Sequence, residues 1–204
     1  MNLKDKIRNP QVQQTILEVV FPIVGYLLWE WSLMIIIVFY LLDYIIGQIF
    51  FIRRLYFSMS FHKDLKYSII FSSIFSFLLF LSGELLILND SFTLIYAELD
   101  KSHYQELIKF AKEEVWLLFP AIGLMYFMTD KMFFYMPRRF LKVKAKNYAL
   151  KNLIANIIIL FLIAGGKFIF DTFQVPELIV IIGIVITKLV FDVYIKKKKL
   201  NIQY

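Results

Sequence analysis

Cysteine is absent from this chain of 204 residues, and histidine occurs only twice, at His62 and His103. Without cysteine the chain has no disulfide, no thiolate metal site and no cysteine nucleophile. Two separate histidines, neither of them in a later apolar stretch, do not supply the ligands of a metal-dependent membrane protease or hydroxylase. We therefore expect no bound metal and no other cofactor.

Short catalytic motifs are missing as well. The sequence contains no Gly-x-Ser-x-Gly elbow, no glycine-rich phosphate loop and no Ser-His pair within an apolar stretch. Glu113 and Glu114 resemble the paired glutamates of intramembrane CAAX-type proteases, but the arginine expected shortly after them is absent. We expect a protein without catalytic residues that is not an enzyme.

Polar surface is scarce, because 60% of the residues are hydrophobic and 18% are aromatic. A soluble domain of this length needs more polar residues. Six helical crossings of about 20 residues each use roughly 120 residues, which leaves room only for short loops. The sequence therefore predicts an all-α polytopic membrane helical bundle, with residues 1–204 forming a single transmembrane domain.

Six apolar stretches are the expected transmembrane helices. They are residues 15–31, 32–52, 67–88, 115–136, 149–170 and 178–195. The first has the shortest uninterrupted core, residues 19–29, so an arrangement with five spans stays open as the alternative.

Lysine and arginine gather in every second connecting segment. These basic segments are residues 4–8, 53–66, 138–151 and 196–199. Positive residues near span ends are retained in the cytoplasm, and all four segments lie on one side only with six spans. Six spans with both termini cytoplasmic is the favoured prediction. The net charge of +7 follows from this topology, so we expect membrane lipid rather than nucleic acid as a partner.

A few ionisable residues interrupt the apolar stretches. A charge at the centre of a span costs about 2.5 to 3.5 kcal/mol, so it tends to face the bundle interior, pair, or line water. A rise of about 1.5 Å per residue places Asp43, Asp130 and Lys188 at similar depth. We expect these three in one polar layer, which is either a structural ion-pair network or a proton- or ion-responsive site. The candidate residues of an ion or proton pathway, or of buried ion pairs, are Asp43, Glu84, Asp130, Lys131, Lys167 and Lys188.

Basic side chains beside the span ends form a second candidate site, for contact with lipid or a cytoplasmic partner. They are Arg53, Arg54, Arg138, Arg139, Lys142 and Lys144. Among uncharged polar residues, Gln48, Thr129 and Asn156 are expected to form hydrogen bonds between helices.

A Phe-Pro-x-x-Gly pattern occurs twice, beginning at Phe21 and again at Phe119. A duplicated hairpin, as in many transporters, and chance in a phenylalanine-rich chain both stay open as explanations.

The first occurrence belongs to a longer pattern. It is formed by Phe21, Pro22, Gly25, Trp31, Ser32, Tyr40, Asp43 and Gly47. In these residues the segment 21–50 resembles the opening helical hairpin of an uncharacterised family of bacterial multi-pass membrane proteins. The resemblance implies an integral protein of the bacterial inner membrane and assigns no activity.

Two functions fit these features. The first is an ion or proton channel or transporter with a buried charged layer. A six-helix unit is too small to enclose a wide pore and would need partners or self-association, so we expect a homo-oligomer. The second is a non-catalytic membrane module that recruits cytoplasmic partners or lipid through its basic loops, for instance in a stress or phage-defence system.

Overall fold

The computed structural model describes residues 10–31, 33–62, 67–96, 108–110, 112, 115–141, 144–173 and 176–190. All regular elements in these ranges are helical. The longer ones are α2 (Pro10–Leu28), α3 (Leu33–Phe61), α4 (Tyr67–Tyr96), α6 (Val115–Asp130), α7 (Ala145–Phe173) and α8 (Glu177–Val190). Two short elements, the π-helix η1 (Lys131–Tyr135) and the 3-10 helix η2 (Arg139–Leu141), continue from α6.

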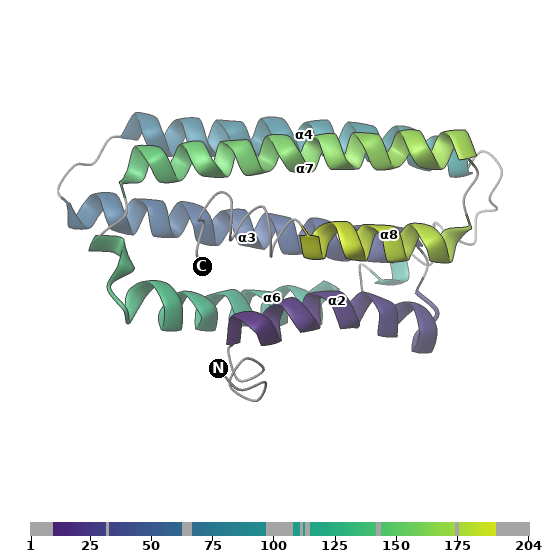
Figure 1. Cartoon of the computed structure of the whole chain (residues 1–204), viewed down its shortest axis with the longest axis horizontal. Helices are drawn as coiled ribbons and strands as arrows, with labels where there is room; N and C mark the ends of the chain where they lie inside the picture. Colours follow the sequence, from purple (N-terminus) through teal and green to yellow (C-terminus); the bar gives the residue numbers. More distant parts are fainter. Residues whose placement is uncertain are drawn as a thin grey trace.

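The helices lie along one common axis, and consecutive helices run in opposite directions (Figure 1). α4 and α7 lie side by side along one edge of the bundle, α2 and α6 lie along the opposite edge, and α3 and α8 lie between them (Figure 1). α3 contacts every one of the other long helices. It is the central helix of the bundle.

Four helical segments are long and apolar enough to cross a membrane. They are Ile35–Phe61, Tyr67–Leu86, Val115–Tyr135 and Ala145–Gly165. Two shorter apolar segments, Val19–Leu28 and Leu178–Val190, correspond to the first and last of the expected spans. Within the described ranges the prediction of an all-helical fold is confirmed, and its four apolar helices are compatible with a membrane bundle. The number of crossings and the side of the termini stay predictions.

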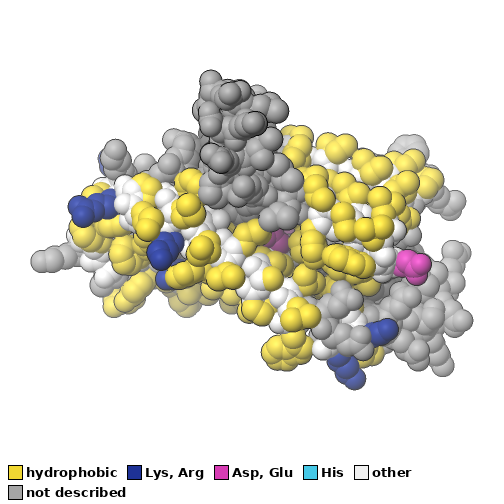
Figure 2. All heavy atoms as spheres, turned by 90° about the horizontal axis from the view of Figure 1, so that it is seen from below, with side chains coloured by type: hydrophobic (Ala, Val, Ile, Leu, Met, Phe, Trp, Pro, Cys, Tyr) yellow, Lys and Arg dark blue, Asp and Glu magenta, His cyan; other side chains and the backbone are white. Residues whose placement is uncertain are grey.

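Hydrophobic side chains cover the outside of the bundle. Phe71 and Phe75 of α4, Trp116 of α6 and Phe161 of α7 are all exposed. Figure 2 shows one face, on which the visible Lys and Arg side chains lie mainly towards the two ends and hydrophobic side chains cover most of the area between. Such a surface suits contact with lipid hydrocarbon, in which only structures with internally satisfied backbones are stable. The chain is a membrane protein.

α3 is longer than the sequence predicts. The expected span ends at residue 52, before the Arg53-Arg54 doublet, but the helix continues to Phe61. The added segment contains no proline or glycine, and its residues Leu55 and Met59 are buried against Tyr148 and Ala155 of α7. Because this packing extends the helix, Arg53 and Arg54 lie within α3 rather than in a cytoplasmic loop.

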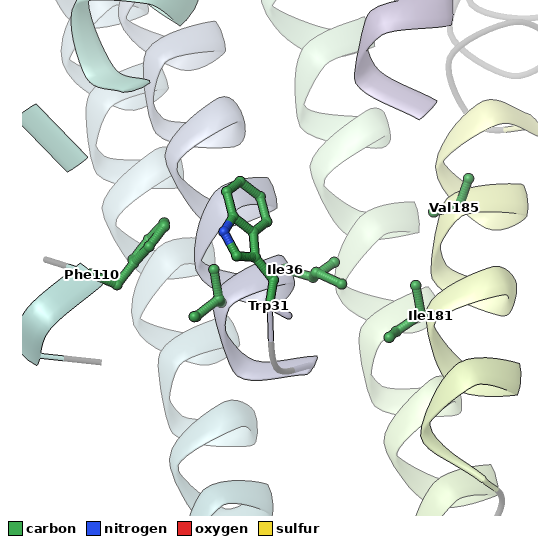
Figure 3. Packing of buried hydrophobic residues seen from close by; sticks show 6 residues of the cluster. Trp31, Ile36, Phe110, Ile181 and Val185 are labelled. Atoms are coloured by element: carbon green, nitrogen blue, oxygen red, sulfur yellow. The ribbon is translucent and has the colours of Figure 1, made fainter. Parts of the chain in front are cut away.

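The turn between α2 and α3 folds a tryptophan back onto α2. Glu30 has a positive φ of 53°, and the Trp31 backbone N–H donates a hydrogen bond of 3.0 Å to the Gly25 carbonyl. The buried Trp31 ring then lies between Phe110 on one side and Ile181 of α8 on the other (Figure 3). This cluster joins α2, α3 and α8 at the end of the bundle where α3 begins, opposite its last residue Phe61.

Gly25 is required by the close approach of the Trp31 ring. A Cβ at Gly25 would lie 2.4 Å from a ring carbon of Trp31, whereas a Cβ at Gly123 would meet nothing within 4 Å. The two Phe-Pro-x-x-Gly patterns therefore differ in packing, although α2 and α6 are neighbours.

Replacing Gly25 by alanine should lower the free energy of unfolding in detergent by about 1 to 3 kcal/mol, because the ring must move out of a packed site. The matched change Gly123→Ala should be neutral or stabilising by about 0.5 to 1 kcal/mol. It meets no neighbouring atom and only reduces the conformational freedom of the unfolded chain. Thermal and denaturant unfolding followed by tryptophan fluorescence measures both. Equal effects of the two changes would contradict this packing.

Candidate functional site: buried charges along α3

The carboxylate of Asp43 is buried at the junction of three helices. Its side chain on α3 is 1% exposed. The Lys188 ammonium of α8 donates a hydrogen bond of 2.9 Å to Oδ2, and the Tyr126 hydroxyl of α6 donates one of 3.1 Å to Oδ1. Each carboxylate oxygen thus has its own donor, which offsets the cost of removing the charge from water.

Gly47, one turn along α3, makes room for Tyr126. A Cβ at Gly47 would lie 3.0 Å from the Tyr126 hydroxyl oxygen, closer than a side chain normally allows. Phe50 lies a further turn along and stacks on the Tyr126 ring, with 5.7 Å between the ring centroids. Gly47, which has no side chain, and the aromatic ring of Phe50 together hold the Tyr126 phenol against Asp43.

A second buried charge pair joins Arg54 of α3 to Asp130, the last residue of α6. Their side chains are 0% and 1% exposed, and Arg54 Nε lies 3.5 Å from Asp130 Oδ1. The same Nε lies 3.3 Å from the Phe50 carbonyl oxygen, to which it donates a hydrogen bond. The guanidinium carbon lies 5.9 Å from the centre of the Tyr148 ring on α7, within the range of a cation–π interaction.

The expected single polar layer is therefore divided into two pairs. Asp43 and Lys188 pair as the sequence suggests, but Asp130 pairs with Arg54 instead. Asp43 and Arg54 are eleven residues apart, which is about 16 Å along the helix axis at ~1.5 Å per residue. The arginine side chain shortens this separation because it points back along its helix towards Phe50. Lys131 is exposed and takes part in neither pair.

Arg54 is the main correction to the second candidate site. The sequence places it among the lipid- or partner-contacting cations, but its burial and its bond to the Phe50 carbonyl direct it into the bundle. Its neighbour Arg53 is exposed, and its guanidinium carbon lies 5.4 Å from the centre of the Phe127 ring. A rotation of about 100° between consecutive helical residues separates the two arginines.

Two other members of this basic set, Arg138 and Lys144, lie near the same end of the bundle. Arg138 and Lys144 are exposed, and Arg138 has a positive φ of 53°. The side chains of Arg139 and Lys142 lie outside the described residues. The adjoining turn is held against α3 by Ser58, whose hydroxyl donates a hydrogen bond of 3.2 Å to the Phe140 carbonyl.

An amide network connects α3 to α7. Gln48 Nε2 donates a hydrogen bond of 2.8 Å to Asn156 Oδ1, and Asn152 Nδ2 donates one of 2.9 Å to Gln48 Oε1. All three side chains are buried. The expectation that Gln48 and Asn156 bond between helices is confirmed. Thr129 is buried, and Asn152 is a partner that the sequence analysis missed.

Glu84 is a third buried carboxyl group, on α4. It is 1% exposed, and its Oε1 has no hydrogen-bond partner among the described residues. It lies close enough to Tyr44 of the neighbouring α3 for an electrostatic interaction between the two groups. Lys167, another of the candidate residues, belongs to α7, but its side chain lies outside the described residues.

These groups are chemically suited to proton or ion exchange more than to metal binding. Within the described residues, no three His, Asp or Glu side chains come close enough together to hold a metal ion. Carboxylates paired with a single cation each can instead change protonation or exchange partners when the local charge changes.

Comparison of the chain with family models, with curated proteins and with solved structures gives no match.

The Arg54–Asp130 pair can be tested by a double-mutant cycle. Arg54→Met leaves a buried carboxylate without its cation and should lower the free energy of unfolding by about 3 to 5 kcal/mol. The double change Arg54→Met/Asp130→Asn removes both charges and should recover a large part of that loss. Denaturant unfolding in detergent measures the cycle. If the two single effects simply add in the double variant, the residues do not interact energetically.

Proposed function

We propose that this membrane protein is an oligomeric channel or transporter for protons or small ions, and that the path follows α3. The observation that carries the proposal is the pair of buried ion pairs on one central helix, Asp43 with Lys188 and Arg54 with Asp130. Ionisable residues inside a membrane are costly, and they commonly mark ion pathways and proton relays.

The polar groups extend along α3 rather than meeting at one point. Gln48 and its amide partners on α7 lie between the levels of Asp43 and Arg54 on the helix. A single ion pair would be enough to fix one helix contact, and an apolar contact of the same shape often stabilises as well or better. Polar groups spread over about 16 Å of helix therefore support a route through the bundle.

The basic end of the bundle is proposed to face the cytoplasm. The end of α3, the beginning of α4 and the η2 turn before α7 lie at the same end (Figure 1), near the exposed Arg53, Arg138 and Lys144. This placement follows the positive-inside rule. With the resemblance of residues 21–50, it supports a bacterial inner membrane as the location. We propose no catalytic activity.

Proton and ion flux into liposomes tests the function directly. The purified protein should conduct, and Asp43→Asn and Asp130→Asn should each lower the flux by about tenfold, equivalent to ~1.4 kcal/mol in the barrier. Glu30→Gln is the matched control, since Glu30 is an exposed carboxylate in the α2–α3 turn. Monodisperse elution and an unchanged helical circular dichroism spectrum establish that each variant is folded.

A silent wild-type protein of confirmed fold and oligomeric mass would contradict conduction. Flux that is insensitive to both aspartates but present in the wild type would retain a transport function and reject α3 as its path.

The exposed cations support a second candidate function, a membrane module that holds acidic lipid or a cytoplasmic partner at its basic end. Arg53, Arg138 and Lys144 are exposed there, and cations near an anionic membrane surface each contribute about 1 kcal/mol. In this function the buried pairs act only as structural contacts.

Native mass spectrometry with phosphatidylglycerol tests this second function. The triple change Arg53→Gln/Arg138→Asn/Lys144→Gln should reduce the number of retained lipids, and asparagine suits the positive φ at position 138. Lys109→Gln/Lys112→Gln is the control, because both lysines are exposed and precede α6, whose first residue lies far from the basic end. Equal lipid retention by both variants would exclude specific lipid binding at the basic end.

A further inference from the structure

Two tyrosine hydroxyls near the Arg54–Asp130 pair are buried and unpaired. Tyr135 is the last residue of η1, and Tyr148 lies in the first turn of α7. Neither hydroxyl oxygen has a hydrogen-bond partner among the described residues. A buried hydroxyl without a partner is destabilising, so two of them at one place need an explanation.

The carboxylate of Asp130 also lacks hydrogen-bond donors among the described residues. Neither of its carboxylate oxygens accepts a hydrogen bond within the described part of the chain, although Oδ1 lies 3.5 Å from Arg54 Nε. A buried carboxylate normally accepts several hydrogen bonds, because its two oxygens together offer about four acceptor positions. The ion pair therefore leaves acceptor capacity unused.

These groups come from four elements, α3, α6, η1 and α7. Arg54 and Asp130 lie close enough to both tyrosines to interact with them electrostatically, and Tyr148 lies within the same range of Tyr135. Arg54 lies against the face of Tyr148, and the exposed Arg53 lies 5.6 Å from the centre of the Tyr135 ring. The cluster thus contains one carboxylate, two phenols and two guanidinium groups.

The π-helix η1 helps to bring Asp130 and Tyr135 together. Its backbone closes through a 2.9 Å hydrogen bond from the Met136 N–H to the Lys131 carbonyl, across five residues. In an α-helix, residues five positions apart face about 140° away from each other at ~100° per residue. The wider π turn reduces that angle, and single π turns are frequent at functional sites.

We propose that Asp130, Arg54, Tyr135 and Tyr148 line a water-binding pocket, and that its water delivers protons to Asp130. Buried water typically makes about three hydrogen bonds to polar groups that otherwise lack partners, and this cluster offers such groups. The inference rests on the proposed transport function and identifies the proton as the transported species.

The proton step is a simple exchange. A hydronium ion in the pocket breaks one O–H bond, the Asp130 carboxylate forms an O–H bond with that proton, and a neutral water molecule remains. Arg54 keeps its charge throughout and stays against the Tyr148 ring. Reversal of the step releases the proton, so Asp130 returns to the ion pair.

Hydroxyl-radical footprinting in water labelled with a heavy oxygen isotope tests the pocket on the purified full-length protein. The label shows which side chains take up oxygen from neighbouring water. Water in the pocket should make Tyr135 and Tyr148 react at rates near that of the exposed Tyr56, in spite of their buried hydroxyls. Phe134, which is 2% exposed, is the buried aromatic control. Rates for both tyrosines as low as that of Phe134 would overturn the pocket.

Proton flux into liposomes tests the delivery step. Tyr135→Phe/Tyr148→Phe should lower proton flux by about tenfold, whereas Tyr56→Phe should leave it unchanged. The thermal midpoint should fall or stay constant in the double variant, because a hydrated hydroxyl is lost. A rise in the midpoint would show that the hydroxyls are dry and would also overturn the pocket.

The outcomes separate this inference from the function on which it rests. A wild type that carries no protons, with both tyrosines labelled by water, would reject proton delivery and retain the pocket. A wild type that conducts through Asp43 and Asp130, with the double tyrosine variant equally active, would retain the transport function and reject delivery by this water.

Discussion

The constraint on which this structure depends is that α3 carries an acid and a base through the centre of an apolar bundle. Asp43 and Arg54 are buried, so each requires a partner from another helix. Lys188 brings α8 to the acid, and Asp130 brings the end of α6 to the base. Because hydrocarbon supplies no alternative partner, these two contacts restrict where both helices pack and how they are rotated.

The class of the fold was predictable from composition, and the ion-pair partners were predictable only in part. From the sequence, the second span is expected to end at residue 52, just before the Arg53-Arg54 doublet. The helix instead continues to Phe61, because buried Leu55 and Met59 keep packing against α7. Once Arg54 lies within the helix, it competes for Asp130, and the expected single layer cannot form.

A signal for this pairing was present in the spacing of α3. Asp43, Gly47, Phe50 and Arg54 follow one another at intervals of four, three and four residues, which places them along one face of a helix. That face meets Tyr126 and Asp130 of α6. Such a stripe predicts which side chains share a surface. It does not predict the rotation of the neighbouring helix, which decides that Asp130 contacts α3 while Lys131 is exposed.

The two charge pairs are also connected through α6. Tyr126 donates to Asp43, and Asp130, one turn further along the same helix, pairs with Arg54. A helical turn is stiff, so a displacement of α6 that moves Asp130 away from Arg54 also moves the Tyr126 hydroxyl relative to Asp43. The π-helical segment begins directly after Asp130, where the regular α-helical hydrogen bonds are interrupted. Single π turns of this kind are frequent at functional sites, and this one lies beside the Arg54–Asp130 pair.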